Sequence, residues 1–384
     1  MQIQVGSKHL AVDTSVALDA QGREYLVVLA KATWSIPGPG QRPRPLLPLP
    51  VVSTDDYFGA PGESAMRYGA DVARFKPRCD VIFDATAYSA GGVPVTSLLA
   101  GWRVGDLSKQ VRAVGPRHWT SSLEPGRPAA FSDMPLRYSH AYGGTRSYED
   151  PAPRVETFEL NPVGLGFAGP RTLAQMSGQA LPTLEAVDDP ILRPDGAHRA
   201  VAFGPIGRHW VPRRGLSGTY DERWRKEVFP FLPDDFDEAF NQVAPPDQQM
   251  PFPRGGEEVT LTRLMPHQEG SAERRFRLPR LDQPAVRVLR QDYSQERLTP
   301  VVDTLFFETD AVIEEDSGRR GRLTAVWRVA TPIRRRIQEF SVITVGPVDE
   351  AWWTAKAMGQ ADASCVGCAP ARTPATSEIG EDDE

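Results

Sequence analysis

Three aspartates have the type and setting for acid–base chemistry. Asp80 and Asp84 stand four apart in an apolar, strand-like stretch, and Asp247 lies in the polar loop "APPDQQM". On a regular strand Asp80 and Asp84 point to the same side, because side chains alternate with a period of two. Their separation would then be about 13 Å, too far for the carboxylate pair of a retaining glycosidase. Pairing with an arginine such as Arg78, or capping of turns, is therefore the favoured interpretation.

A glycine-rich stretch, "GLGFAG" at residues 164–169, matches the formal pattern of a dinucleotide-binding loop. That chemistry requires a strand before the first glycine and a helix after the second. Here Pro162 precedes the pattern and Pro170 follows it at once, and the preceding "PRVETFELN" is too polar for a buried parallel strand, although it suits an exposed one. We therefore expect no cofactor, and a tightly folded loop whose glycines allow positive φ or close backbone approach.

Metal and nucleophile signatures are weak. The tail carries one C-x-x-C, Cys365 and Cys368, without the second ligand pair of a zinc site. The six histidines form no H-x-x-x-H or H-E-x-x-H arrangement, and no G-x-S-x-G elbow is present. A Ser-His-Asp triad dispersed along the sequence stays open. His140 and His209 are expected to be packed or hydrogen-bonded, and no metal or catalytic set is predicted.

Arginine and aromatic residues gather instead in loops rich in glycine and proline: "RYSHAYGG" (137–144), "GRHWVPRRG" (207–215) and "GTYDERW" (218–224). These residue types are enriched in the hot spots of protein interfaces. The competing interpretation places tryptophans such as Trp102 and Trp210 in the core. The predicted protein-binding residues are Arg137, Tyr142, Gly143, Asn161, Gly164, Trp210, Tyr220, Trp224, Asp247 and Gln248.

The composition of the chain limits the kinds of protein in which these loops can occur. The chain has 384 residues, 40% of them hydrophobic, with 36 prolines and 33 glycines, which favours short strands and turns over long helices. A formal net charge of −6 gives no basic excess for binding nucleic acid. The sequence contains no run of about 18 apolar residues, so no membrane span is predicted. The segment "MQIQVGSKHL" lacks the features of a signal peptide. We expect a cytoplasmic protein without nucleic-acid or membrane partners.

The elements that position these loops are mostly strands. A hairpin is predicted at 15–34, and an antiparallel meander at 80–88, 93–104 and 109–114. The expected fold class is mainly β (α+β at most): antiparallel meander or sandwich-like sheets with a few short helices and long loops. One domain is expected over 1–345, with a sub-boundary near 250–256 as an alternative, and a short helix and a disordered acidic tail over 346–384. Further strands are predicted at 257–265, 274–279, 285–290, 301–309 and 323–330, and helices near 220–228, 234–243 and 348–358.

Seven segments in one order resemble a bacterial family labelled only as a domain of unknown function. Members of that family are encoded beside type VI secretion spike and effector genes. The resemblance extends weakly through "VVDTLFFETD" and "LTAVWR" and covers roughly residues 1–345. The segments are "FKPRCDV" (75–81), "RYSHAYGG" (137–144), "NPVGLGF" (161–167), "FGPIGRHWVPR" (203–213), "GTYDERW" (218–224), "LPDDFD" (232–237) and "APPDQQ" (244–249).

The resemblance implies a non-enzymatic adaptor, or effector chaperone. Such a protein would hold a toxin effector or its PAAR-type tip domain and load that cargo onto the trimeric VgrG spike. The family supplies no catalytic residues, and Cys365 and Cys368 lie outside its pattern. Two alternatives stay open: a hydrolase that uses Asp80, Asp84 or Asp247, and a structural component of the spike that is exported with the cargo.

Overall fold

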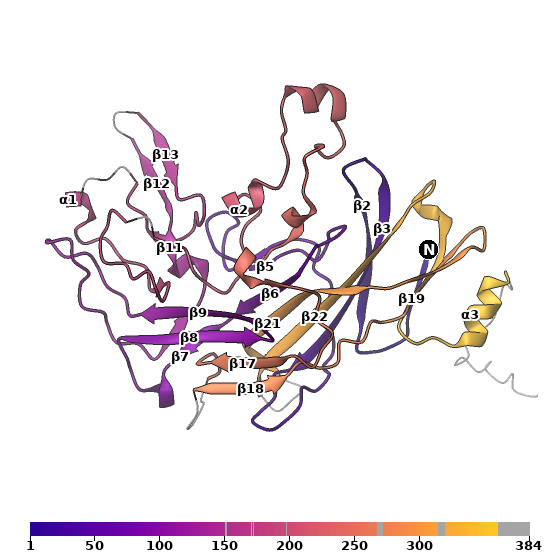
Figure 1. The fold of residues 1–384 in the computed structure, drawn as a ribbon, viewed down its shortest axis with the longest axis horizontal. Helices are drawn as coiled ribbons and strands as arrows, with labels where there is room; N and C mark the ends of the chain where they lie inside the picture. The colour runs from indigo at the N-terminus through magenta and orange to yellow at the C-terminus, as the bar shows by residue number, and fades with distance from the viewer. Residues whose placement is uncertain are drawn as a thin grey trace, which may run out of the picture.

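The computed structural model describes residues 1–149, 152–169, 171, 173–196, 198–266, 272–313 and 319–359 (Figure 1). The expectation of a mainly β fold is confirmed, because strands make up most of the regular structure. The described α-helices are short: α1 (Leu173–Met176), α2 (Val211–Arg214) and α3 (Glu350–Ala357). No helix among these residues is long and apolar enough to cross a membrane. Cys365, Cys368 and His267 lie outside the described residues.

A six-stranded sheet forms the centre of the molecule. The predicted hairpin appears as β2 and β3, which pair in register from Ala11 with Lys31 to Leu18 with Glu24. The long strands β21 and β22 also form an antiparallel pair. The sheet order is β16 (Gln249–Met250), β6 (Cys79–Asp84), β21 (Val301–Ile313), β22 (Arg319–Pro332), β3 (Glu24–Ser35) and β2 (Ala11–Leu18).

Two further sheets flank the centre. In the five-stranded sheet, the predicted hairpin around Gly105–Asp106 joins β8 and β9. Strands from both sides of residues 250–256 share this sheet, since β17 pairs with β8. Its order is β15 (Leu184–Glu185), β9 (Leu107–Val114), β8 (Ser97–Val104), β17 (Glu258–Thr262) and β18 (Glu273–Arg277). The four-stranded sheet has the order β1 (Gln2–Val5), β23 (Phe340–Val345), β19 (Val286–Arg290) and β20 (Gln295–Leu298).

Short two-stranded ribbons occupy the loop-rich part of the chain. The segment before the glycine loop forms an exposed strand paired with residues 145–148, as its polarity indicated. The ribbons are β4 (Asp56–Tyr57) with β5 (Met66–Tyr68), β7 (Thr86–Tyr88) with β10 (Asp133–Pro135), β11 (Tyr142–Gly143) with β14 (Leu165–Gly166), and β12 (Thr145–Tyr148) with β13 (Arg154–Thr157).

Stacked aromatic rings join the central and five-stranded sheets. The ring of Phe83 on β6 stacks on Phe307 of β21 with centroids 4.5 Å apart. The same ring stacks on Trp102 of β8 at 5.0 Å. All three side chains are almost fully buried, so the core between the sheets is closed by large apolar groups. The core interpretation of Trp102 is correct.

The predicted antiparallel meander through residues 80–114 is wrong in its first strand. Residues 79–84 form β6, which joins the central sheet and runs parallel to β21. Residues 86–88 form a separate short strand, β7, paired with β10. The β6–β21 pairing joins segments more than two hundred residues apart, so adjacent turn signals gave no indication of it. Only β8 and β9 pair as the meander required.

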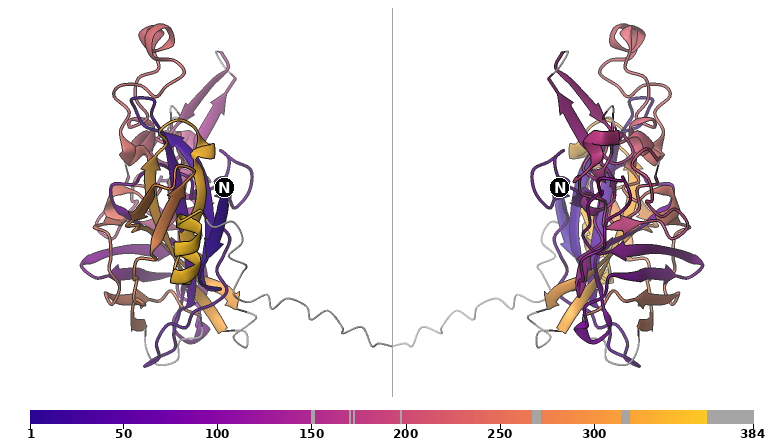
Figure 2. Two further views of the ribbon diagram at one scale, coloured as in Figure 1. Left: turned by 90° about the vertical axis from the view of Figure 1, so that its right-hand side faces the viewer. Right: turned by 90° about the vertical axis from the view of Figure 1, so that its left-hand side faces the viewer.

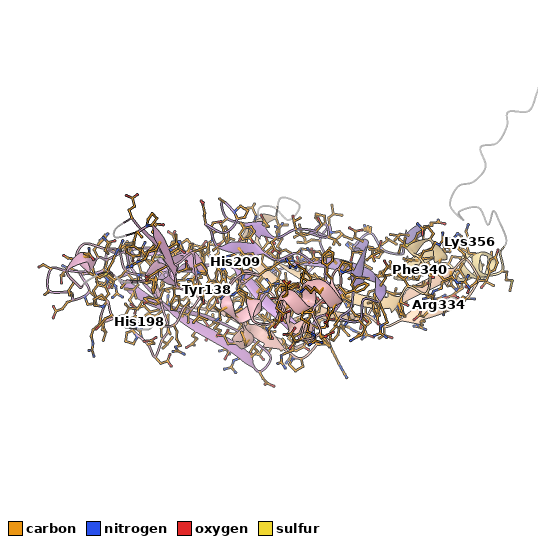
Figure 3. All side chains as sticks on the ribbon, turned by 90° about the horizontal axis from the view of Figure 1, so that it is seen from above. Tyr138, His198, His209, Arg334, Phe340 and Lys356 are labelled. Atoms are coloured by element: carbon orange, nitrogen blue, oxygen red, sulfur yellow. The ribbon has the colours of Figure 1, made fainter. Side chains whose placement is uncertain are left out.

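The molecule is long and flat, and two segments project from its upper edge (Figures 1 and 2). One is the hairpin β12–β13, and the other is the segment 215–237, which follows α2 and is named the arm. Seen from above, His209 and Tyr138 lie near the middle, and Phe340 and Lys356 lie near the end that carries α3 (Figure 3). The arm rises above the packed sheets (Figure 1).

Candidate protein-binding surface

An aromatic cluster lies on the arm. The ring of Trp224 packs edge-to-face against Tyr220, with centroids 4.7 Å apart, and against Phe229 at 5.6 Å. Tyr220, Phe229 and Phe231 are 53%, 65% and 44% exposed. Exposed apolar side chains are ordinary when scattered, but a contiguous aromatic group on a projection is a mark of a docking site. The cluster can supply rigid apolar anchors to a partner.

Hydrogen bonds inside the arm hold this cluster in shape. Asp221 Oδ1 accepts from the backbone N–H of Trp224 at 2.8 Å, at the start of the π-helical turn Trp224–Val228. The indole N–H of Trp224 donates to the carbonyl oxygen of Phe231 at 2.9 Å. Lower down, the Thr219 N–H and hydroxyl both donate to the carboxylate of Asp235. The rings are thus preorganised, which reduces the ordering cost of binding.

One buried arginine closes the base of the arm. The guanidinium of Arg213 donates to Phe240 O at 3.0 and 3.1 Å and to Ile206 O at 2.9 Å. Burial lowers the pKa of Arg213 to about 10. This side chain joins the residue before the arm to the segment that follows it, so the two ends of the arm stay together.

The arm also leans on the hairpin of the central sheet. Gly22 lies in the turn between β2 and β3 with φ +73°, and a Cβ there would be 2.5 Å from the ring of Phe231. Only glycine gives this turn both the left-handed conformation and the room for the ring. The direction of the arm is therefore set by a contact with the sheet.

The charges of the arm distinguish between two kinds of apolar partner. The arm carries six acidic and three basic residues. Its cations are also paired: Arg223 with Glu227 at 3.2 Å, and Arg225 and Lys226 with Glu222 at 2.7 and 3.2 Å. A segment that binds anionic lipid needs an excess of unpaired Lys and Arg. The arm has the opposite balance, so a protein surface suits it better than a membrane.

Two predicted loops fold against each other away from the arm. The Asn161 amide donates to Tyr138 O at 2.9 Å and to Tyr142 O at 3.0 Å. The Leu165 N–H donates to Ala141 O at 2.9 Å. The structure thus brings "RYSHAYGG" and "NPVGLGF" together, with Tyr142, Gly143, Asn161 and Gly164 all buried. The backbone amides of the glycine loop are used in this packing.

Gly164 gives a direct test of that packing. We expect Gly164→Ala to lower the free energy of unfolding by about 2 kcal/mol, because the new methyl overpacks a filled site. Its Cβ would lie 2.9 Å from Gly143 Cα and 2.5 Å from Ala141 O. Gly204→Ala is the matched control, since its Cβ would have 3.7 Å to its nearest neighbour, Met66 O. Equal losses in chemical denaturation for both variants would contradict this account of the loop.

Arg137 is committed to contacts inside the molecule. Its guanidinium lies 3.6 Å from Asp84 and stacks 3.5 Å from the ring centre of Phe58. Asp84 also pairs with Arg67 at 3.2 Å. Burial raises the pKa of Asp84, against the lowering effect of Arg137 and Arg67. About a third of the Arg137 side chain is exposed, so a partner could reach only its edge.

The "APPDQQ" segment fastens the chain after the arm to the central sheet. Gln248 is buried, and its amide donates to Val81 O at 2.8 Å and to Phe203 O at 2.9 Å. Its carbonyl accepts from Lys109 at 2.8 Å, and the exposed Asp247 pairs with the same ammonium at 2.9 Å. Burial lowers the pKa of Lys109. Asp247 therefore sits in a salt bridge at the surface.

The ten predicted binding residues thus divide by burial. Tyr220 and Trp224 lie on the arm, Asp247 is exposed, and Arg137 is half-buried. Phe229 and Phe231 extend the arm cluster but were not predicted; the run "FPF" between charged residues was the available signal. The six buried residues shape loops and cannot contact a partner without rearrangement: Tyr142, Gly143, Asn161, Gly164, Trp210 and Gln248.

A family model described as an uncharacterized protein conserved in bacteria (DUF2169) matches residues 21–315. The chain belongs to this family. The match includes the arm, both buried loops and the "APPDQQ" segment, and therefore most of the resemblance seen in the sequence. No curated protein and no solved structure matches the chain. Among the described residues, no group of His, Cys, Asp or Glu is arranged to hold a metal ion.

Proposed function

We propose that this family member is an adaptor of type VI secretion that binds a toxin effector or its PAAR-type tip domain and helps load it onto the VgrG spike. The observation that carries the binding role is the exposed, preorganised aromatic cluster of the arm. The assignment to type VI secretion rests on the resemblance of the ordered sequence segments to the family. Binding of another protein and placement in this pathway are separate steps, and each needs its own test.

The arm suits an adaptor because cargo must be held and then released. Aromatic anchors on a small projection bury limited area, which gives a moderate interface rather than an obligate one. The paired charges around the rings provide a polar rim that adds specificity but little affinity. A spike surface that fits the cargo better can then displace the adaptor.

Co-expression with the proteins encoded beside its gene tests this proposal. We expect affinity capture followed by size-exclusion chromatography to give a complex with the effector or its tip domain, and the complex to dissociate when spike protein is added. Capture of neither protein would contradict the proposal. Co-secretion of the chain with its cargo, detected in culture medium, would instead favour the exported spike component.

A further inference from the structure

We propose a second docking site, separate from the arm: the edge strand β18 binds an extended partner segment in which acidic and apolar residues alternate. The strand lies at the lower edge of the molecule, whereas the arm rises from the upper edge (Figure 1). The inference does not depend on a role in secretion, because it concerns the chemistry of this edge alone.

The backbone of β18 is open on one side. Among the residues that the structure describes, the strand ends the five-stranded sheet and pairs only with β17. The Leu278 N–H donates to Glu257 O, and the Leu278 carbonyl accepts from the Gly256 N–H. The backbone N–H and C=O groups of the even-numbered residues therefore point toward β17. Arg275 and Arg277 therefore direct their N–H and C=O groups outward, since the two groups of one residue share a side. No described residue pairs with those groups, so another strand can.

A hollow of about 730 Å³ lies beside this edge. Its lining includes the loop Gly40–Pro43, Arg275–Arg277 of β18 and the residues Leu278–Arg280 that follow the strand. Cavities of this size hold small ligands or a few residues of extended chain. The lining also includes Gly256 and Glu258 on the β17 side, so the hollow extends over the face that carries Arg275 and Arg277 and offers room for side chains of an added strand on that face.

The charges of the hollow select an acidic segment. Four of its twelve lining residues are arginines, Arg42, Arg275, Arg277 and Arg280, and the only acidic one is Glu258. Arg275 and Arg280 pair with Glu273 and Asp282, but these are exposed pairs that exchange at little cost. Arg42 makes no ion pair with any described residue. One nitrogen of Arg277 donates to Gly256 O at 3.0 Å, and carboxylates of a partner would bind the remaining guanidinium nitrogens of this group.

The pleat of β18 sets the spacing of the partner's residues. Arg275 and Arg277 are exposed on one face, whereas Phe276 between them is buried on the other. Residues opposite each other on paired strands share a face. Carboxylates opposite the two arginines would therefore be two residues apart, with an apolar residue between them facing the side of Phe276. If the arginines only protected the edge from self-association, the protein would not prefer peptides in which acidic and apolar residues alternate.

Fluorescence anisotropy with a labelled peptide that alternates Glu and Val over seven residues tests the inference on the full chain. We expect binding that weakens with added salt and falls about tenfold in Arg277→Glu. Arg297→Glu, on the exposed edge strand β20 of another sheet, is the matched control and should bind as the unchanged protein does.

Two modified peptides complete the test. Methylation of the peptide's backbone nitrogens that face β18 should abolish binding, because it removes the hydrogen bonds between the strands. A peptide with Lys in place of Glu should also fail to bind, because its charges repel the arginines. Absence of binding by the Glu-Val peptide, equal binding by the two charge-reversed proteins, or indifference to backbone methylation would each overturn the proposal. If the edge of β18 does not bind the peptide, the proposal that the arm binds cargo is unaffected, since capture by the arm is measured separately.

Discussion

Asp80→Asn is expected to lower the free energy of unfolding by about 3–5 kcal/mol, the cost of breaking a fully buried charge pair. One carboxylate oxygen accepts from Lys76 at 2.9 Å and from the N–H of Val243 at 3.0 Å. The other accepts from Gln242 at 2.6 Å and from the N–H of Ala244 at 3.1 Å. All four partners are donors, so either orientation of the asparagine amide places an NH₂ group against two of them.

Asp84→Asn is the matched control, on the same strand and with the same chemical change. We expect it to cost less than about 1 kcal/mol. Burial raises the pKa of Asp84, so the fold favours the neutral carboxyl relative to the unfolded chain. The stabilising contribution of this group is therefore greatest at low pH and declines as pH rises through its folded pKa. Asparagine is neutral at every pH and avoids the desolvation cost of an ionised carboxylate, which offsets part of the loss of the pairs with Arg67 and Arg137.

Denaturant unfolding of both variants at neutral pH compares the two sites. A large shift of the midpoint for Asp80→Asn beside a small one for Asp84→Asn is the expected result. Equal losses would mean that the pairs of Asp84 with Arg67 and Arg137 contribute as much as the buried Asp80 network. Because Asp80 holds residues 242–244 just after the arm, we also expect faster proteolysis of the arm in the Asp80 variant.

Local features of the fold could be predicted from the sequence. The hairpins β2–β3 and β8–β9 follow from alternating apolar residues on either side of short turns, such as Gly105–Asp106, and their pairing involves neighbouring segments only. The same locality explains the last helix, α3, predicted near residues 348–358. These elements need no information from distant parts of the chain.

The position of β6 could not be predicted in this way. Its partner β21 begins at Val301, and parallel strands carry no turn signal between them. The burial of Asp80 and Gln248 also depends on distant segments, because Asp80 accepts from Gln242 and Gln248 donates to Val81 O. A polar residue in a loop-like sequence reads as exposed until its donors and acceptors are known. Residue type therefore predicts Gln248 as a binding residue, whereas its buried amide fastens the chain to the sheet.

The exposure of the aromatic residues on the arm could also not be predicted from the sequence. Residue type alone predicts Tyr220 and Trp224 as binding residues, although it also favours a place in the core for any one tryptophan. What separates Trp224 from the buried Trp210 is the projection of the arm from the sheets, which the base contacts of Arg213 produce. Exposure is a property of the whole fold, so residue type could not assign it.

Trp224→Ala is expected to weaken capture of the cargo protein by about 30-fold or more, a loss of at least about 2 kcal/mol typical of a hot-spot tryptophan. The ring joins Tyr220 and Phe229 into one surface, and its N–H fixes Phe231 O. Its loss would remove an anchor and loosen its neighbours together. Global stability should change little, because the arm stands outside the sheets. The measurement is the affinity for the effector or tip domain recovered by co-expression, beside the denaturation midpoint.

Two variants decide whether the arm is the contact. Trp352→Ala removes the same residue type from α3, outside the family-matched region, and should leave capture unchanged. Tyr220→Ala removes a ring that is 53% exposed and leaves the Trp224 N–H bond in place. If the arm binds cargo directly, Tyr220→Ala weakens capture while the circular dichroism spectrum and unfolding midpoint stay constant. Full capture by both arm variants would show that the aromatic cluster is not the docking surface and would direct attention to the edge of β18.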